Sequence, residues 1–478
     1  MRFIEIFKKV GRAVKSLFSK KATIEKAFDN CEICISSTMM DEISLWKSLY
    51  ACKPPWIGED SKVKKTMNTA VGIAGELARL STMELESEIS GDSQMATFLN
   101  EEYQKILKKA ENYVEFACAM GGVVLKPYVV PDKGTIEVSI IQADEFYVTH
   151  YEDNGTILGA IFPDQKIISG KKYTRLERHE FVGNKYVIEN KAFVVEIAPE
   201  AMTDTEDSLG RECPLEEVPD WAGIQPIVTL DNVEHPLFAY LRMPIANNKD
   251  SRSPLGVSVF SRAVEALQEV DVQYSRILWE YKATEAAVFA DQDILPTDSK
   301  GNVDLDATEE RLYRKLDGFE KQMEAYNPDI RSDPLFKGLD KHLKHVEFLC
   351  NLAYGTISDP QTVDKTAEEV KSAKQRSFSM VTNIQANIEE AHEELVYAMY
   401  VQAVLYGLAP NGAYEVIHDF GDSINSDREV EFKRRMAMAA AGMLRPELVV
   451  AWYFQCSEEE ALKMMPNPIT EEDGPEEE

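Results

Sequence analysis

The 478-residue sequence lacks the features that mark several large classes of protein. No apolar run approaches the roughly 18 residues that a membrane-spanning helix needs, and charged residues interrupt the N-terminus where a signal peptide would have its apolar core. The seven cysteines are odd in number and scattered, which favours reduced thiols in a cytosolic compartment over a disulfide framework. We therefore expect an intracellular protein of roughly two to four structural units.

Positive charge is also in short supply, with 52 Lys and Arg against 82 Asp and Glu and a formal net charge of -30. Sequence-reading DNA-binding proteins gain most of their affinity by neutralising phosphates with Lys and Arg, so this balance excludes an ordinary protein of that class. An acidic disordered polymer is excluded as well, because 44% hydrophobic and 9% aromatic residues are enough to build packed cores.

Catalytic and metal-binding motifs are missing. The sequence contains no GxxxxGK[ST] phosphate loop, no HExxH zinc motif, no GxSxG elbow and no GxGxxG loop after a strand. Cys31 and Cys34 form a CxxC pair without a second pair at zinc-finger spacing, and for His342 and His345, one helical turn apart, a structural or solvated role is favoured. We predict no catalytic residue, no metal site and no cofactor.

One segment departs from the acidic composition. Residues 1–21 carry seven basic residues and one acid, and apolar residues recur there at helical spacing. This pattern predicts a basic amphipathic arm over residues 1–25, whose cationic side holds Lys8, Lys9, Arg12 and Lys15. Such an arm either docks on an acidic partner, nucleic acid or a membrane surface, or packs on its own protein.

Hydrophobic periodicity predicts an α+β body over residues 26–254. Its first part is mainly helical, with helices over 71–80 and 93–118, the second capped by Asp92 or Ser93 and stopped by Gly121–Gly122. The period then changes to two, which predicts short antiparallel strands over residues 123–195, arranged as a meander. Residues 196–256 show little periodicity and are predicted to form an ordered but irregular connection.

Beyond residue 254 the pattern is mainly helical. An apolar stripe predicts a long helix over 255–287, a polar insert over 288–332 and a second helix over 333–354 with Asp333 as N-cap. A polar loop over 355–365 follows, and a capping box at Thr366 opens a third long helix in the segment 366–426. Short helices are predicted over 427–466 and an acidic disordered tail over 467–478.

Several short segments, each weak alone, follow one another in a specific order and spacing: Asp41–Tyr50 with Pro55 and Trp56, Tyr173–Phe181, Leu237–Pro244, Ser253–Ser258 and Thr366–Val370. Together with the hairpin and its insert, they make nearly the whole chain similar to the portal proteins of tailed bacteriophages. The similarity is to the siphophage-type portal or minor capsid family, which forms the head–tail connector.

The resemblance implies a portal fold, assembled as a ring of about 12 copies at one capsid vertex. Residues 26–254 and 366–426 would form the α+β wing, the helices 255–287 and 333–354 the hairpin stem, and 288–332 the small clip. Residues 355–365 would be the tunnel loop and 427–466 the helical crown. Such a ring is a non-enzymatic channel for DNA packaging and ejection, located in the virion and, during assembly, in the host cytoplasm.

The resemblance also implies which residues meet partners. The tunnel loop would face DNA with Gly355, Ser358, Asp359, Gln361, Asp364 and Lys365, and the clip would contact partner proteins with Asp291, Asp293, Lys321 and Glu324. The implied partners are further copies of the chain, double-stranded DNA that passes without sequence specificity, the terminase, capsid and scaffold proteins, and a head–tail adaptor, with no membrane among them. An acidic wall suits a conduit that must not hold DNA.

Two alternatives come from other readings of the same sequence. The chain could be a different structural protein of the virion neck or minor head, with another ring size or no channel wide enough for DNA. It could instead be a cytosolic acidic enzyme with its active site in the 123–195 sheet, for which Glu177, His179 and Glu180 are the best candidate residues.

Overall fold

The computed structural model describes residues 21–28, 31–58, 64–196, 209–291, 295, 313–316, 323–326, 329–359, 367–421, 428–454 and 458–465. They belong to two compact units, Met1–His418 and Asp419–Glu478. Both helices and strands are abundant, so the chain is of mixed α and β structure. The basic residues Lys8, Lys9, Arg12 and Lys15 and the acidic tail lie outside the described residues. No helix in the described part of the chain is both long and apolar enough to cross a membrane.

The helical part of the larger unit follows local signals in the sequence. It contains α2 (Ser37–Tyr50), α3 (Thr69–Thr82), strand β1 (Glu86–Ser90), α4 (Gln94–Leu107) and α5 (Ala110–Met120). The Ser93 hydroxyl accepts a hydrogen bond from the Ala96 amide at 2.9 Å, as its predicted capping role requires. The helix predicted over 93–118 is nevertheless two helices, because Lys109 leaves helical geometry with φ -106° and ψ 14°.

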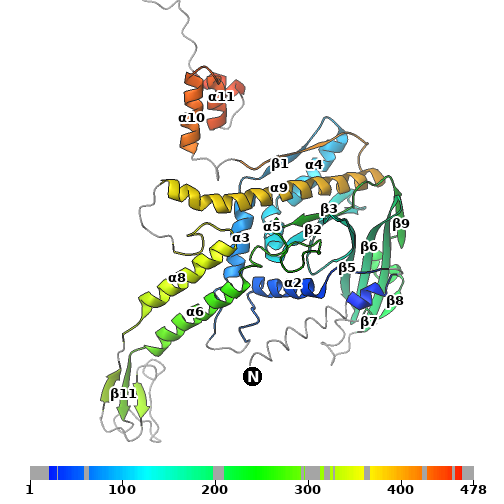
Figure 1. Ribbon diagram of the computed structural model, residues 1–478. Coiled ribbons are helices and arrows are strands. Elements are labelled where there is room, and N and C mark those ends of the chain that lie inside the picture. The colour runs from blue at the N-terminus through cyan, green and yellow to red at the C-terminus, as the bar shows by residue number, and fades with distance from the viewer. Residues whose placement is uncertain are drawn as a thin grey trace, which may run out of the picture. The chain divides into compact units, whose positions relative to one another are not determined.

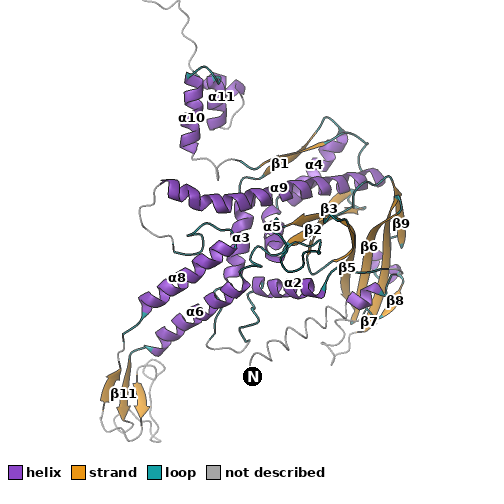
Figure 2. Cartoon of the chain, in the orientation of Figure 1, coloured by secondary structure: helices purple, strands orange, loops and turns teal. Residues whose placement is uncertain are grey.

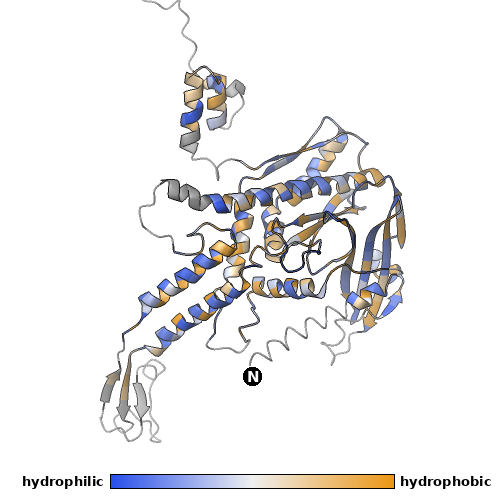
Figure 3. Ribbon diagram, in the orientation of Figure 1, coloured by the Kyte–Doolittle hydropathy of each residue, from blue (hydrophilic) through white to orange (hydrophobic). Residues whose placement is uncertain are grey.

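The long helix α9 (Ala367–Leu405) crosses these elements and completes the core (Figure 1). It contacts α3, α4 and the strands β2 and β10, whose bounds follow below. Its buried side chains include Ile384, Ile388 and Leu395, and α3, which it contacts, contributes the fully buried Ile73 and Leu77. Figure 3 shows polar and apolar residues alternating along α9, as expected of a helix with one covered face.

The strands of the larger unit form two main sheets rather than the single predicted meander (Figure 2). The three-stranded sheet has the order β10–β2–β3, with β2 at Gly122–Val130, β3 at Thr135–Gln142 and β10 at Ala239–Arg242. The second sheet runs β4–β5–β6–β7–β8, with β9 also paired to β7, and its strands are Tyr147–Tyr151, Ile157–Ile168, Lys171–Val182, Lys185–Glu196, Arg211–Cys213 and Ile227–Asp231. All these pairs are antiparallel.

The segment predicted to be irregular, residues 196–256, supplies the strands β8, β9 and β10. Two short 3₁₀ helices, Leu215–Glu217 and Pro219–Trp221, lie between β8 and β9, and buried Trp221 packs there with Val218 under β6 and β7. Sequence alternation predicts two short strands at 186–188 and 192–195, but in the structure both belong to one strand, β7. Strand β14 (Glu415–Asp419) pairs with β1 far back in the sequence.

Two glycines bring the end of α5 against the segment that precedes the hairpin. Gly121 ends α5 with φ +90°, and a Cβ atom on Gly256 would overlap the carbonyl oxygen of Gly121. The Val259 amide donates to the Cys118 carbonyl at 2.9 Å, and the Met243 amide donates to the Gly121 carbonyl at 3.0 Å. The backbones touch directly, so only glycine fits at residue 256.

The helical hairpin consists of α6 (Val264–Ala283) and α8 (Ser332–Leu349), which run side by side (Figure 1). The first helix begins nine residues later than predicted, because residues 255–263 form buried turns whose backbone bonds to α5 instead. The second begins at Ser332, so Asp333 lies in its first turn and is not the N-cap. It ends at Leu349, five residues before the predicted end, where Asn351 adopts φ +57°.

A small sheet lies at the far end of the hairpin (Figure 1). Strand β11 (Ala287–Asp291) is central and pairs in parallel with β12 (Tyr313–Leu316) and antiparallel with β13 (Met323–Tyr326). The sequence predicts strands at 288–290 and 321–326 but not β12.

The smaller unit contains three short helices close to those predicted: α10 (Arg428–Ala440), α11 (Pro446–Phe454) and α12 (Glu458–Met464). The rings of Phe432 and Tyr453 lie 4.6 Å apart and hold α10 against α11, and the Arg435 guanidinium lies 4.3 Å from the Trp452 ring.

Candidate functional site on the helical hairpin

The two hairpin helices are joined by an apolar seam and by polar links. Leu267, Val270 and Ile277 of α6 are buried, as are Leu339, Leu343 and Val346 of α8. Arg331 donates to both carboxylate oxygens of Glu280, with Nε at 2.9 Å and a terminal nitrogen at 2.7 Å. These hydrogen bonds hold the pKa of Glu280 below its ordinary value. The link fixes the helices at the end that carries the small sheet.

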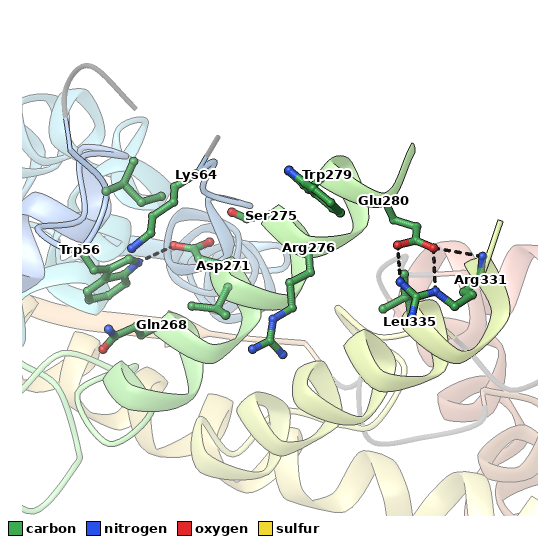
Figure 4. Close-up of a pocket in the computed structure, with 12 residues that line it drawn as sticks. Trp56, Lys64, Gln268, Asp271, Ser275, Arg276, Trp279, Glu280, Arg331 and Leu335 are labelled. Atoms are coloured by element: carbon green, nitrogen blue, oxygen red, sulfur yellow. Dashed lines mark hydrogen bonds and ion pairs between the residues drawn. The ribbon is translucent and has the colours of Figure 1, made fainter. Parts of the chain in front are cut away.

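A groove of about 390 Å³ opens along α6 (Figure 4). Its lining comes from three parts of the chain: Trp56, Ile57 and Lys64 from the segment before α3, the α6 residues Gln268, Asp271, Val272, Ser275, Arg276, Trp279 and Glu280, and Arg331 and Leu335 beside or within α8. The groove therefore lies where the segment before α3 runs along α6, close to the start of α8.

Asp271 fixes that segment against α6. Its Oδ2 accepts from the Trp56 indole at 2.9 Å and its Oδ1 accepts from the Met67 amide at 2.8 Å. The Lys65 amide donates to the Ser275 hydroxyl at 3.0 Å. Because Asp271 is only 5% exposed, these bonds replace the water that its carboxylate loses.

Large apolar side chains remain open to solvent on the hairpin. Trp279 is 55% exposed at the edge of the groove and Tyr281 is 45% exposed beyond it, and on α8 Phe336 and Phe348 are about half exposed. Because Trp279 and Tyr281 are two positions apart on α6, they lie on different sides of the helix, and exposed Trp and Tyr side chains are enriched at interfaces. The hairpin thus presents apolar surface that one copy of the chain leaves uncovered.

The residues that follow α8 fold back onto it around one carboxylate. Glu347 is completely buried, and its Oε1 accepts from the amides of Gly355 at 3.1 Å, Ile357 at 2.7 Å and Ser358 at 2.9 Å. Its Oε2 accepts from the Ser358 hydroxyl at 2.8 Å. We call residues 353–359 the loop base, because the predicted tunnel loop begins within them.

Further bonds tie the loop base to both neighbouring helices. The Asp359 amide donates to Asp340 of α8 at 3.1 Å, and the Ala353 amide donates to the Ser377 hydroxyl of α9 at 2.6 Å. The Arg376 guanidinium of α9 lies 4.7 Å from the Phe348 ring and 5.6 Å from the Tyr354 ring. The loop base is therefore an ordered structure before any assembly takes place.

The structure places some of the predicted site residues together. Gly355 and Ser358 meet at Glu347, and Asp359 is the exposed residue with which the described loop base ends. Ser358, which was predicted to face DNA, is instead 4% exposed and donates its hydroxyl inward. Asp291 and Glu324 belong to neighbouring strands of the small sheet. Outside the described residues lie Asp293, Lys321, Gln361, Asp364 and Lys365.

Two of the three residues proposed for an enzyme site, Glu177 and His179, belong to a closed network on the second sheet, whereas Glu180 forms an ion pair with Arg178 instead. The His179 ring bonds to Glu177 at 2.7 Å and to the Tyr186 hydroxyl at 2.9 Å, and burial lowers the pKa of His179. Burial alone would raise the pKa of Glu177, but Lys126 at 2.7 Å, His179 and Arg175 together outweigh burial and hold that pKa well below its ordinary value. Both ring nitrogens of His179 are used within the sheet, which favours a structural role.

Neither motif considered for metal binding gathers a set of ligands. Cys34 donates its thiol to the Thr149 carbonyl at 3.2 Å, and burial raises the pKa of Cys31 and of Cys34. His342 and His345 both lie on α8, half-buried and exposed respectively. Across the described ranges, no three His, Cys, Asp or Glu side chains lie close enough to hold an ion.

Three solved chains from gene transfer agent (GTA) particles are similar to this chain at low sequence identity. No protein-family model matches the sequence, and no curated protein matches it. A chain from the neck of an empty GTA particle computed with C6 symmetry has 13% identity and a TM-score of 0.41, covering 91% of this chain and 98% of that chain. A chain from the neck of the native GTA particle computed with C12 symmetry has 12% identity and a TM-score of 0.41, covering 91% and 98%.

A chain from the virion of the native gene transfer agent (GTA) particle has 11% identity and a TM-score of 0.42, covering 92% of this chain and 99% of that chain. These similarities span most of both chains at low identity, and they assign no function to this one.

Proposed function

We propose that the chain is the subunit of a portal, a ring at one vertex of a virus capsid through which double-stranded DNA is packaged and later ejected. The ring would be non-enzymatic, contain about 12 copies, and serve as the docking site for a terminase, for capsid and scaffold proteins and for a head–tail adaptor. The proposal rests first on the sequence resemblance, whose segments follow one another in a fixed order along the chain.

The uncovered apolar surface of the hairpin is the structural observation that carries the proposal. Trp279 and Tyr281 of α6 and Phe336 of α8 are exposed in one copy. A neighbouring copy can cover them through a heterologous contact, in which one surface of each chain meets a different surface of the next. Repetition of that contact closes a ring when the rotation from one copy to the next is a full turn divided by a whole number.

The parts of the chain take roles within that ring. We assign the stem to α6 and α8, the clip to the sheet of β11, β12 and β13, the crown to the smaller unit, and the wing to the sheets and helices before α6 together with α9. Asp291 and Glu324 of the clip sheet would meet the partner proteins. The DNA-facing part of the loop after α8 would begin at exposed Asp359, since Ser358 points inward.

The charge balance supports passage of DNA over capture of DNA. Each copy carries a formal charge of -30, so a ring wall built from such copies repels phosphates unless cations gather in one place. DNA can then move past the wall without the counterion-driven affinity that holds it on basic proteins.

The experiment is native mass spectrometry of purified protein, with negative-stain imaging along the ring axis. We expect wild type to form a ring and Trp279→Glu to shift the population to small species, because a charge would be buried at the contact. The control is Ile167→Glu, which changes an equally apolar residue that is 71% exposed on the β5–β6 hairpin and should leave the ring intact. A wild-type monomer at high concentration would contradict the proposal, and a ring without a DNA-wide channel would favour another neck protein.

A further inference from the structure

The buried carboxylate of Glu347 is a charged group for which the proposed ring gives no reason. Its side chain has no exposed surface, and an ionised carboxylate without partners is costly to bury. Every bond to it described above comes from a backbone amide or a hydroxyl of the loop base, and no Lys or Arg pairs with it within the described residues. Within the described residues, the carboxylate is therefore stabilised by loop amides and the Ser358 hydroxyl, without a cation.

We propose that Glu347 is a positioning residue, whose carboxylate fills an anion-binding nest formed by the backbone of residues 355–358 and so fixes where the loop after α8 begins. The nest is the arrangement in which successive amides point into one concavity. Here Gly355 has φ +93°, which turns its amide inward, and the amides of Ile357 and Ser358 converge on the same oxygen. The helix supplies the anion and the loop supplies the donors.

The position of Glu347 on α8 lets one side chain locate the whole loop base. Its backbone carbonyl also accepts from the Leu352 amide at 2.9 Å, which closes the end of the helix. The side chain then reaches forward to donors eight to eleven residues ahead. Any displacement of this turn of α8 is passed to Asp359, the residue at which we place the start of the DNA-facing segment.

The geometry gives different expectations for three substitutions. Glu347→Asp keeps the charge but shortens the reach by one methylene. Glu347→Gln keeps the shape and one acceptor oxygen but removes the charge. Glu347→Ala removes both and leaves the donors of the nest around an empty space of carboxylate size, into which a small carboxylate such as acetate can bind.

Hydrogen exchange at the amides of Gly355, Ile357 and Ser358 tests the nest in the full chain. We expect exchange in Glu347→Ala to be at least about tenfold faster than in wild type, because hydrogen bonds to a charged acceptor contribute at least that factor. Glu347→Gln should lie between the two. Added acetate should restore protection in Glu347→Ala and leave Glu347→Gln unchanged, since the Gln side chain occupies the space. Chloride at the same ionic strength should restore nothing.

Two controls separate a local effect from general loosening. The amides of Leu339 and Leu343 on α8 should exchange equally in all variants, and Asp333→Ala, an exposed acid on the same helix, should leave the loop base unchanged. Unchanged exchange at the three nest amides in Glu347→Ala, or protection that does not respond to acetate, would overturn the proposal. If Glu347→Ala unfolds, the comparison of nest and helix amides in Glu347→Gln decides the question alone.

The DNA-related part of this role rests on the proposed function and has its own measurement. Rings of Glu347→Ala should assemble like wild type but retain packaged DNA less well, with acetate restoring retention. If wild type forms no ring, the proposed function fails while the exchange result still judges the nest. If rings form and exchange changes but retention does not, the nest stands and its role toward DNA is wrong.

Discussion

Two buried glutamates in different regions of the chain are stabilised in opposite ways. Glu177, in the second sheet, is paired with the cation of Lys126 at 2.7 Å and that of Arg175 at 3.1 Å. Glu347, at the end of the hairpin, is bonded to neutral amides and a hydroxyl of its own loop. Around Glu177, four charged or titratable side chains from strands of both main sheets fix one another: Glu177, Lys126, Arg175 and His179. At the loop base, one charge organises a segment that has no sheet to hold it.

The difference teaches what each site does for the protein. Loss of the sheet carboxylate leaves the buried Lys126 ammonium without its ion-pair partner, so the damage should spread beyond the site. Loss of the hairpin carboxylate leaves only neutral donors, and the damage should stay within residues 353–359. A carboxylate held by cations supports stability, whereas one held by backbone amides supports local geometry.

Glu177→Ala is the substitution with the largest expected effect. It leaves Lys126 buried without its ion-pair partner at 10% side-chain exposure, and removal of one partner from a buried pair costs about 3–5 kcal/mol. The free energy of unfolding from urea titration measures this cost. A double variant in which Lys126 is also replaced by Met should recover part of the loss. A loss of unfolding free energy below about 0.5 kcal/mol, as for an ordinary surface substitution, would show that the network does not stabilise the sheet.

Gly256→Ala tests whether the hairpin and the part of the larger unit that contains α5 share their stability. The added Cβ overlaps the Gly121 carbonyl, and because backbone must move to accept it we expect a cost of about 3 kcal/mol. Gly223→Ala, at a position with open space around it, is the matched control. Tryptophan fluorescence and far-UV circular dichroism should report one common transition if the two regions unfold together. Separate transitions would mean that the hairpin is independently stable.

Glu394 of α9 is a half-buried carboxylate, and its one hydrogen bond within the described residues comes from the Tyr240 amide at 3.3 Å. Burial raises the pKa of Glu394 to about 7, above the unfolded value. Its contribution to stability is therefore full below about pH 4.5 and is lost as the pH rises through 7. Glu394→Gln should remove this loss, worth on the order of 2 kcal/mol after allowance for solvent.

The measurement is the difference in unfolding free energy between wild type and Glu394→Gln from pH 4.5 to pH 8. A difference is needed because His392 acts in the opposite direction: burial lowers its pKa to about 3, so its contribution is lost as the pH falls below about 6.5. The unfolding free energy of wild type, compared with that of Glu394→Gln, should be highest near pH 4.5 and should fall as the pH rises toward 8. A flat difference would mean that Glu394 keeps an ordinary pKa.

Local signals in the sequence predict much of the fold. Ser93 caps its helix, Gly121 ends the next, and the periodic stripes locate α6, α8 and α9, because such features depend on residues within one or two turns. The partition of strands into two sheets is not predictable in this way. Strand β10 pairs with β2, more than a hundred residues earlier in the chain. The alternation of polar and apolar residues in a strand does not predict which strand it pairs with.

In the candidate site, too, some features can be predicted from local sequence and others cannot. The exposed residues of α6 and the polar loop after α8 can be read from periodicity and composition. The role of Glu347 cannot, because its donors are backbone amides, which every residue carries, and their convergence depends on the turn at Gly355. The inward direction of Ser358 has the same cause, since a serine in a polar loop carries no local sign of burial.

The order of strands in the small sheet at the end of the hairpin has a mechanical consequence. Strand β11 continues from α6 and β13 leads into α8, and the two are antiparallel neighbours, so both helices join the sheet at the same end of one ladder. Pulling the two helices apart would break the hydrogen bonds between β11 and β13 in sequence, starting from the end nearest the helices. Tension along the hairpin axis would instead load both strands from the same end and leave the ladder without shear.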